Sequence, residues 1–344
     1  MSIYELKVCK EEDKKNLIAF IKKYWQEDHV FVRSEKLLRF QHYNESKKEF
    51  NFILGYNTIS KEIDGIVGLI PLSHFDSKLE IFNQTWGGIW KVRQDVKNAE
   101  IGILGLLLFE EFNKYSLKGG IGMSVLATKF YKLMKYNTCT LNQYYILNNC
   151  IRDFKIAIVP TSSNLDIDFH LDSGLEIKEI KNILDISESD IEDRYWPRKS
   201  VAYFFNRFHL HPFYVYKFYG IYSEDDILKT IFVSRIIEIN NRKVLRIVDV
   251  LGKLEGLKSI KNELLKLLKS ESAEYVDLMN YGIHPDVVIQ LGFEQLDIKG
   301  RIVIPNYFEP FLQQNILIHC GYKSPYPYVM FKADADQDRP NLID

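Results

Sequence analysis

Apolar positions in the first half of the chain change period several times, and each change predicts an element. Between Glu12 and Trp25 they recur every three or four residues, which is the spacing of one helix face. On either side of the polar turn Ser60–Asp64 the pattern is that of a strand hairpin. The predicted order is strand Ile3–Cys9, helices Glu12–Trp25 and Glu35–Tyr43, strands Phe50–Asn57, Ile63–Leu72 and Thr85–Arg93, helix Ile103–Tyr115, strand Gly120–Val125, helix Ala127–Tyr136 and a strand pair from Thr138.

The second half repeats this order after a polar stretch, Pro160 to Asn164. Its predicted elements are strand Glu176–Leu184, helical segments Ser187–Tyr195 and Ser200–Phe208, strands Tyr214–Tyr222, Leu228–Ile239 and Val244–Leu251, helix Leu257–Ser270, strand Tyr275–Tyr281 and helix Pro285–Leu291. A chain of 344 residues also exceeds the usual size of a single core. We therefore expect a first domain over 1–150, a linker over 151–172, and a second domain over 173–344 that ends in a tail.

In both halves a central strand enters a loop and a helix, and a strand, a helix and a further strand follow. This order resembles the GNAT acyltransferase fold, and the resemblance spans nearly the whole chain. It implies an α/β protein with mixed (α+β) sheets, built from two GNAT-like domains in tandem. It also implies acyl-coenzyme A as co-substrate and an amine as acceptor.

The end of the central strand in the first half occupies the register of the family's pyrophosphate loop. An apolar residue is followed by basic residues and a glycine, although Asn98 and Glu100 stand where the family usually has glycines. The resemblance implies backbone N–H groups near the thioester oxygen and a helix N-terminus facing the pyrophosphate. The residues it implies for acyl-CoA binding are Lys91, Val92, Arg93, Lys97, Gly102 and Tyr131, the last in a helix beside the pantetheine arm.

The corresponding loop of the second half, Gly252–Gly256, departs further from a phosphate cradle, because it continues as Lys-Leu-Glu after its first glycine. Acyl-CoA is therefore expected in the first domain. A thioester already carries a good leaving group, so the reaction mainly requires positioning of a neutral amine and stabilisation of an oxyanion.

The C-terminal tail carries alternating acids, and in an extended segment Asp334, Asp336 and Asp338 share one face. Carboxylates bind sugar hydroxyls or an ammonium, and an arginine binds phosphate bidentately. The tail and the segment Arg207–Pro212 resemble tandem-GNAT sugar N-acyltransferases of bacterial polysaccharide pathways. That resemblance implies a nucleotide-linked amino-dideoxysugar, of the dTDP type, as acceptor. The expected substrate-binding residues are Trp86, Trp90, Arg207, His211, Tyr281, Asp336, Arg339 and Asn341.

Some of these residues have a second interpretation. Trp86 and Trp90 lie four apart on one strand face, where they either form an aromatic wall for a base or sugar or belong to the core. For the amine proton, Asp249, Asp338 and His284 are the candidate acceptors. A reaction without a dedicated base, relying on the free-amine fraction, remains the alternative.

The composition of the chain argues against several classes of binding partner. The 45 basic and 46 acidic residues leave a net charge of -1, so no global field favours nucleic acid. The four cysteines lack paired spacing, and we expect no metal. No run reaches the ~18 apolar residues of a membrane span, and the first residues lack the apolar core of a signal peptide. We expect a cytoplasmic protein whose partners are small molecules and not a membrane.

Two other functions share this domain plan. One is aminoacyl transfer from tRNA to a cell-wall precursor, as in Fem-like enzymes, although no helical insertion or basic tRNA face is visible. The other is a non-catalytic CoA- or nucleotide-binding GNAT-like module.

Overall fold

A computed structural model of the chain describes residues 3–96, 100–161, 174–191 and 193–343, which form two eight-stranded sheets and a small hairpin. The first sheet has the order β1-β3-β4-β5-β6-β17-β7, with β2 on β3. Its strands are β1 Tyr4–Lys10, β2 Tyr43–Asn44, β3 Glu49–Asn57, β4 Ile63–Pro71, β5 Gln84–Val92, β6 Leu117–Ile121, β7 Asn137–Thr140 and β17 His319–Lys323. Only β5 and β6 run parallel; the other pairs are antiparallel.

Helices cover both faces of the first sheet. One face packs against α1 Lys14–Phe20, α2 Val30–Arg33 and α3 Glu35–His42, and the other against α4 Glu100–Asn113 and α5 Val125–Leu133. The predicted helix over 12–25 is present, but its last turn, Ile21–Trp25, is π-helical. Glycines in β3 and β4 allow close approach of α4, because a methyl group at Gly65 would lie 2.7 Å from Leu108 Cδ1.

The second sheet has the order β14-β8-β13-β12-β11-β10-β9, with β18 on β13. Its strands are β8 Asn142–Leu147, β9 Leu175–Ile180, β10 Lys217–Ser223, β11 Leu228–Ile239, β12 Arg242–Gly252, β13 Ala273–Tyr281, β14 Glu294–Gln295 and β18 Met330–Phe331. The helices are α6 Val201–Phe204, α7 Lys261–Glu271 and α8 Pro285–Gln290, and β15 Tyr307–Phe308 pairs with β16 Phe311–Leu312. As in the first sheet, the central pair β12 and β13 is parallel.

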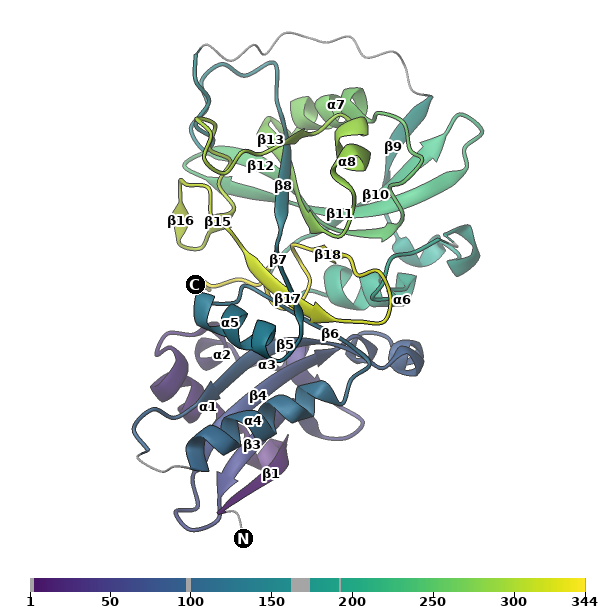
Figure 1. The fold of residues 1–344 in the computed structure, drawn as a ribbon. Coiled ribbons are helices and arrows are strands. Elements are labelled where there is room, and N and C mark those ends of the chain that lie inside the picture. The colour runs from purple at the N-terminus through teal and green to yellow at the C-terminus, as the bar shows by residue number, and fades with distance from the viewer. Residues whose placement is uncertain (1–2, 97–99, 162–173, 192, 344) are drawn as a thin grey trace.

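The two halves exchange strands. The chain leaves the first sheet at β7 and continues directly into β8, which pairs with β13 in the second sheet. Near the C-terminus β17 returns and lies between β6 and β7 of the first sheet, and the tail then lies between the halves (Figure 1). A core of apolar side chains from both halves, including Trp86 and Met279, fills the space between them.

Several predicted elements differ from the structure. The expected strand pair from Thr138 is wrong, because β7 and β8 belong to different sheets. Gly102 was expected in a loop but lies in the first turn of α4, which begins at Glu100. The predicted helix Ser187–Tyr195 is reduced to a short 3-10 turn at Glu188–Asp190. The boundary near 150 stays a prediction, and much of the expected linker lies outside the described residues.

No helix among the described residues is both long enough and apolar enough to cross a membrane.

Candidate functional site

In the first sheet the parallel strands β5 and β6 separate soon after they meet. Their pairing covers only Gln84–Trp86 of β5, opposite Leu117–Gly119 of β6. Beyond Trp86, β5 continues through Gly87–Val92 beside β4, and no described strand pairs with its other edge. Backbone polar groups along that edge are therefore available to an extended ligand.

Small residues and one tyrosine surround this opening, which we call the first splay. A methyl group at Gly87 would lie 3.7 Å from the Tyr131 hydroxyl oxygen, and one at Gly120 would lie 3.4 Å from it. The hydroxyl thus lies between the two separating strands. Tyr131 comes from α5, packs edge-on against Phe109, and has a pKa that burial raises above its ordinary value. It is therefore a proton donor at neutral pH.

The second sheet has the same separation between β12 and β13, but the chain itself fills it. Pairing of these strands ends at Ile247 and Leu278. Beyond that point β18 pairs with Asn280 and Tyr281 on β13, and the Ala333 N–H donates to the Val248 carbonyl at 3.0 Å. No equivalent opening remains there.

A buried ion cluster closes this second splay. The Lys199 ammonium lies 2.7 Å from a carboxylate oxygen of Asp249 and 2.7 Å from one of Asp334. Both carboxylates have no exposed surface. Burial raises the pKa of Asp249, although Lys199 opposes this effect. Asp249, expected as a base, is thus part of a structural contact between β12 and the tail.

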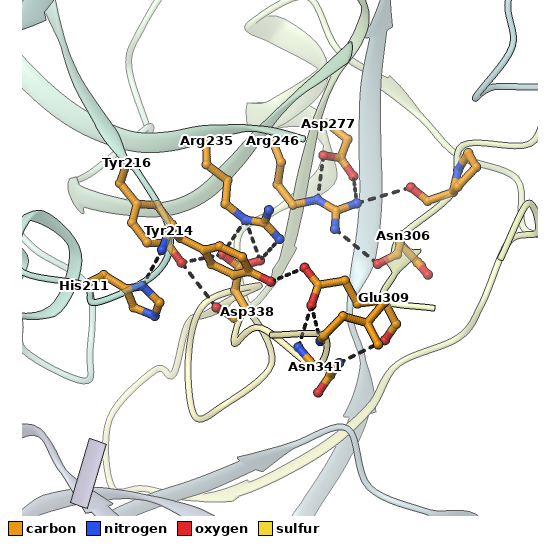
Figure 2. A network of polar contacts seen from close by, with 12 residues as sticks. His211, Tyr214, Tyr216, Arg235, Arg246, Asp277, Asn306, Glu309, Asp338 and Asn341 are labelled. Carbon is orange, nitrogen blue, oxygen red and sulfur yellow. Dashed lines mark hydrogen bonds and ion pairs between the residues drawn. The ribbon is translucent and has the colours of Figure 1, made fainter. Parts of the chain in front are cut away.

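A polar cleft of about 280 Å³ lies between the halves. Its lining comes from the loop before α2, from β11 and β12, from the segment 306–310 and from the tail. Arg235 and Arg246 project side by side from paired positions of neighbouring strands (Figure 2). Asp338 accepts from the Arg235 Nε at 3.0 Å, and Asp277 accepts from the Arg246 terminal nitrogen at 2.7 Å. Burial acts to raise the pKa of Asp338, but the Arg235 guanidinium lowers it to about 2.

One residue in the wall of the cleft lies against the end of β6, next to the first splay. Gln337, which lines the cleft, is in contact with Gly122 just after β6. Arg339, also in the lining, lies 3.0 Å from the Nε2 atom of the buried His29. Aromatic contacts lead from His29 through Phe31 to His42, which lies beside Gly88 of β5. A series of packed, buried side chains therefore connects the wall of the cleft with β5, whereas the lining of the cleft itself includes no residue of β5 or β6.

The tail residues expected to bind substrate lie around this cleft, but mostly with partners. Asp336 forms an ion pair with Arg339, and Asn341 donates its backbone N–H to a Glu309 carboxylate oxygen. Glu309 also accepts from the Tyr214 hydroxyl at 2.6 Å (Figure 2). The tail is therefore held against both halves.

Other expected substrate residues lie apart from the cleft or inside the core. Trp86 is fully buried, and the partly buried Trp90 packs against Phe109 and Phe130, so neither forms an open aromatic wall. Arg207 donates to the carbonyls of Ala333 and Ala335 and so fixes the tail. His211 accepts the Tyr214 N–H at 2.9 Å, and the Tyr281 hydroxyl lies 3.4 Å from that of Tyr322.

Of the residues expected to bind acyl-CoA, Tyr131 and the strand positions Lys91 and Val92 lie at the first splay. Arg93 instead forms ion pairs with Glu62, Asp64 and Asp95. Lys97 lies outside the described residues. His284 is 72% exposed and caps α8.

Sequence reasoning did not identify Arg235, Arg246 and Lys332, the buried cations of the cleft. A signal was present, because Arg246 interrupts an otherwise apolar run and Arg235 does the same one strand earlier. A charge inside a buried strand requires a partner or a function.

Comparisons with known proteins address the fold. No protein-family model and no curated protein matches the chain. A GCN5-related N-acetyltransferase from Anabaena variabilis superposes with a TM-score of 0.54 at 9% identity, covering 93% of this chain and 72% of that one. A conserved Enterococcus faecalis protein, named a probable N-acyltransferase, gives a TM-score of 0.51 at 11% identity, with coverage of 92% and 72%.

The chain has a tandem GNAT-like fold. The predicted fold class is confirmed, and each GNAT-like sheet carries one parallel central pair that separates. At this level of sequence identity the structural similarity establishes the fold alone. The function of each splay in the tandem GNAT-like fold must therefore be argued from the geometry of that splay.

Proposed function

We propose that the protein transfers an acyl group from acyl-CoA to an amine at the first splay. The observation that carries this proposal is the edge of β5 from Gly87 to Val92, which no described strand pairs with on the side of β6. The corresponding opening in the second sheet is closed by the chain's own tail. An extended pantetheine arm has amide groups that suit such an edge. Gly87 and Gly88 have no side chains, so the arm would approach the strand most closely at these two residues.

The chemistry requires few groups. A bound thioester carbonyl polarised by backbone N–H groups of β5 is open to attack by a free amine, and the new C–N bond forms as the C–S bond breaks. The Tyr131 hydroxyl lies where the departing thiolate would take up a proton. Asp249 and Asp338 are held by cations, and His284 does not line the cleft, so we assign the amine proton to solvent.

The proposed acceptor is a nucleotide-linked amino-dideoxysugar, of the dTDP type, bound in the cleft. Buried arginines there suit phosphoryl groups, and Tyr307 offers an aromatic ring for a base or sugar, whereas the Tyr214 ring is already covered by Arg235 and His211. Because Gln337 joins the cleft to the end of β6, a sugar amine held in the cleft would point toward the first splay. The Fem-like and non-catalytic alternatives have no comparable support in the contacts of the described residues.

The test is a mass-spectrometric assay of the purified protein with acetyl-CoA or longer acyl-CoA and a panel of nucleotide-linked aminosugars. We expect acylated sugar and free CoA from the wild type and from Lys253→Glu, which alters the second-domain loop. Gly87→Leu should abolish the product, because the new side chain would enter the first splay. Acyl-CoA binding that Lys253→Glu removes and Gly87→Leu preserves would contradict the proposal.

A further inference from the structure

Lys332 is a buried lysine in the wall of the cleft, and no described residue pairs directly with it. Its side chain is almost wholly buried, at 3% relative exposure. Among the described residues, no hydrogen bond or ion pair holds its ammonium group, which lies 5.7 Å from the Tyr307 ring centroid. An ammonium without a partner is costly to bury. Its retention at a cavity wall therefore suggests a ligand.

The charges next to Lys332 do not supply that partner. Asp338 binds Arg235 and Tyr216, and Asp277 binds Arg246 and Gln143, so both carboxylates are already occupied. Three cations, Arg235, Arg246 and Lys332, thus face two carboxylates. The cluster has one positive charge in excess when Lys332 is protonated.

The remaining acids of the cleft have other partners or lie in other elements. Glu309 accepts from Tyr214 and from two backbone N–H groups of the tail, and Asp336 forms an ion pair with Arg339. Asp28 comes from the first domain and bonds to Gln26. Glu309 keeps its negative charge, because its partners are neutral, so the excess positive charge is that of Arg235, Arg246 and Lys332 over their two carboxylates. One singly charged oxyanion would balance that cluster.

We infer that Lys332, flanked by Arg246 and Arg235, binds a phosphoryl group of the acceptor, one of the two singly charged phosphates of a sugar-linked nucleoside diphosphate. This inference rests on the proposed function for the identity of the acceptor, whereas the anion site itself rests on the cluster alone. Arg246 and Arg235 contribute positive electrostatic potential. Lys332 contributes hydrogen-bond donors, because none of the three N–H bonds of its ammonium group is used by a described residue. A phosphate held there would fix the position of the attached sugar, and so of its amine, within the cleft.

Protonation of Lys332 should couple to binding. Burial, followed by the nearby Arg246 and then Arg235, lowers the pKa of Lys332 to about 7, against the opposing effects of Asp338 and Asp277. A bound phosphate favours the ammonium form, so binding takes up a proton when the free site is neutral. Above pH 7 the affinity should fall about tenfold per pH unit, until the pKa of the bound state is reached.

The test measures binding by calorimetry, with UDP-glucose and dTDP-glucose as probes whose phosphates do not titrate between pH 6 and 8. Lys332→Met keeps an unbranched chain only one atom shorter and removes the charge, and Lys299→Met is a matched control on the exposed surface. We expect Lys332→Met to weaken both probes about 10- to 100-fold and to abolish the pH dependence. Its melting temperature should rise by about 2–4 °C, because an unpaired buried charge is gone.

Binding measurements with inorganic pyrophosphate and with CoA distinguish failure of this inference from failure of the proposed function. If inorganic pyrophosphate binds in a Lys332-dependent way and no nucleotide sugar binds, the anion site stands and the proposed acceptor fails. Loss of CoA binding in Lys332→Met, with nucleotide-sugar binding intact, would assign the site to CoA and overturn the inference. Unchanged binding of every probe in a folded Lys332→Met protein would also overturn it.

Discussion

At the scale of single residues, the position of Tyr131 has the most direct chemical consequence. Its hydroxyl lies between Gly87 and Gly120, and its ring packs among Phe109, Phe112 and Tyr136. This packing fixes the oxygen, which has no hydrogen-bond partner among the residues that the structure describes. A phenylalanine would keep the packing and lose only the proton donor.

Tyr131→Phe should therefore lower kcat about 10²-fold while leaving the KM for acyl-CoA nearly unchanged. The loss is at the lower end of what general acids contribute, because a thiolate is already a good leaving group. Steady-state kinetics with a thiol-detecting reagent would measure it. A Tyr131→Phe enzyme with wild-type kcat would exclude the hydroxyl as proton donor.

At the scale of elements, the two splays show how one topology can be open in one copy and closed in the other. The second splay is closed by β18 and by the Lys199 cluster. These side chains come from three separate elements, so the cluster joins the α6 region, β12 and the tail. Removal of its single cation would leave two buried carboxylates facing each other.

Lys199→Met should destabilise the protein by about 3–5 kcal/mol, the usual cost of breaking a buried ion pair. Adding Asp249→Asn and Asp334→Asn should recover most of that loss, because no buried charge is then left unpaired. Urea unfolding of the single and triple variants measures both effects. A triple variant no more stable than Lys199→Met would show that the cluster contributes through packing and not through charge.

The elements also show what a sequence can specify. Strands β3, β4, β11 and β12 were predicted to within about two residues, because their apolar runs are long and their turns are marked. The hairpin of β3 and β4 was also predicted. The partner of β8 was not predictable, since the pattern in Asn142–Leu147 shows a strand with buried positions but not the sheet to which it belongs. In the cleft, Asp338, Asp336 and Arg339 were predicted from the pattern of the tail. Arg246 and Lys332 were not, because only the folded chain brings their distant segments together.

At the scale of the whole molecule, exchange of β8 and β17 makes each half incomplete without the other. The first sheet lacks the strand between β6 and β7 unless 319–323 is present, and β13 loses a neighbour without 142–147. Three buried hydrophobic residues of β8, Tyr144, Tyr145 and Ile146, would then be exposed on the isolated first half.

Residues 1–161 alone should therefore fail to fold, whereas a mixture with residues 174–344 should assemble into a native-like complex. Near-ultraviolet circular dichroism and gel filtration would report each state. The intact protein, cleaved after folding at a protease site introduced between 162 and 173, is the control and should stay associated. A fragment 1–161 with sharp cooperative unfolding would refute this interdependence.

The late position of β17 also sets a time order for folding during synthesis. Domains usually fold as units while the ribosome is still working, the N-terminal one first. Here the first sheet must wait for residues 319–323, so more than nine tenths of the chain emerges before its gap between β6 and β7 can close. Until then the nascent chain carries two strands with open edges, which are templates for wrong pairing. We expect translation of this protein to depend on chaperone protection for most of its length, and a stalled chain of about 300 residues to be sensitive to protease throughout its first half.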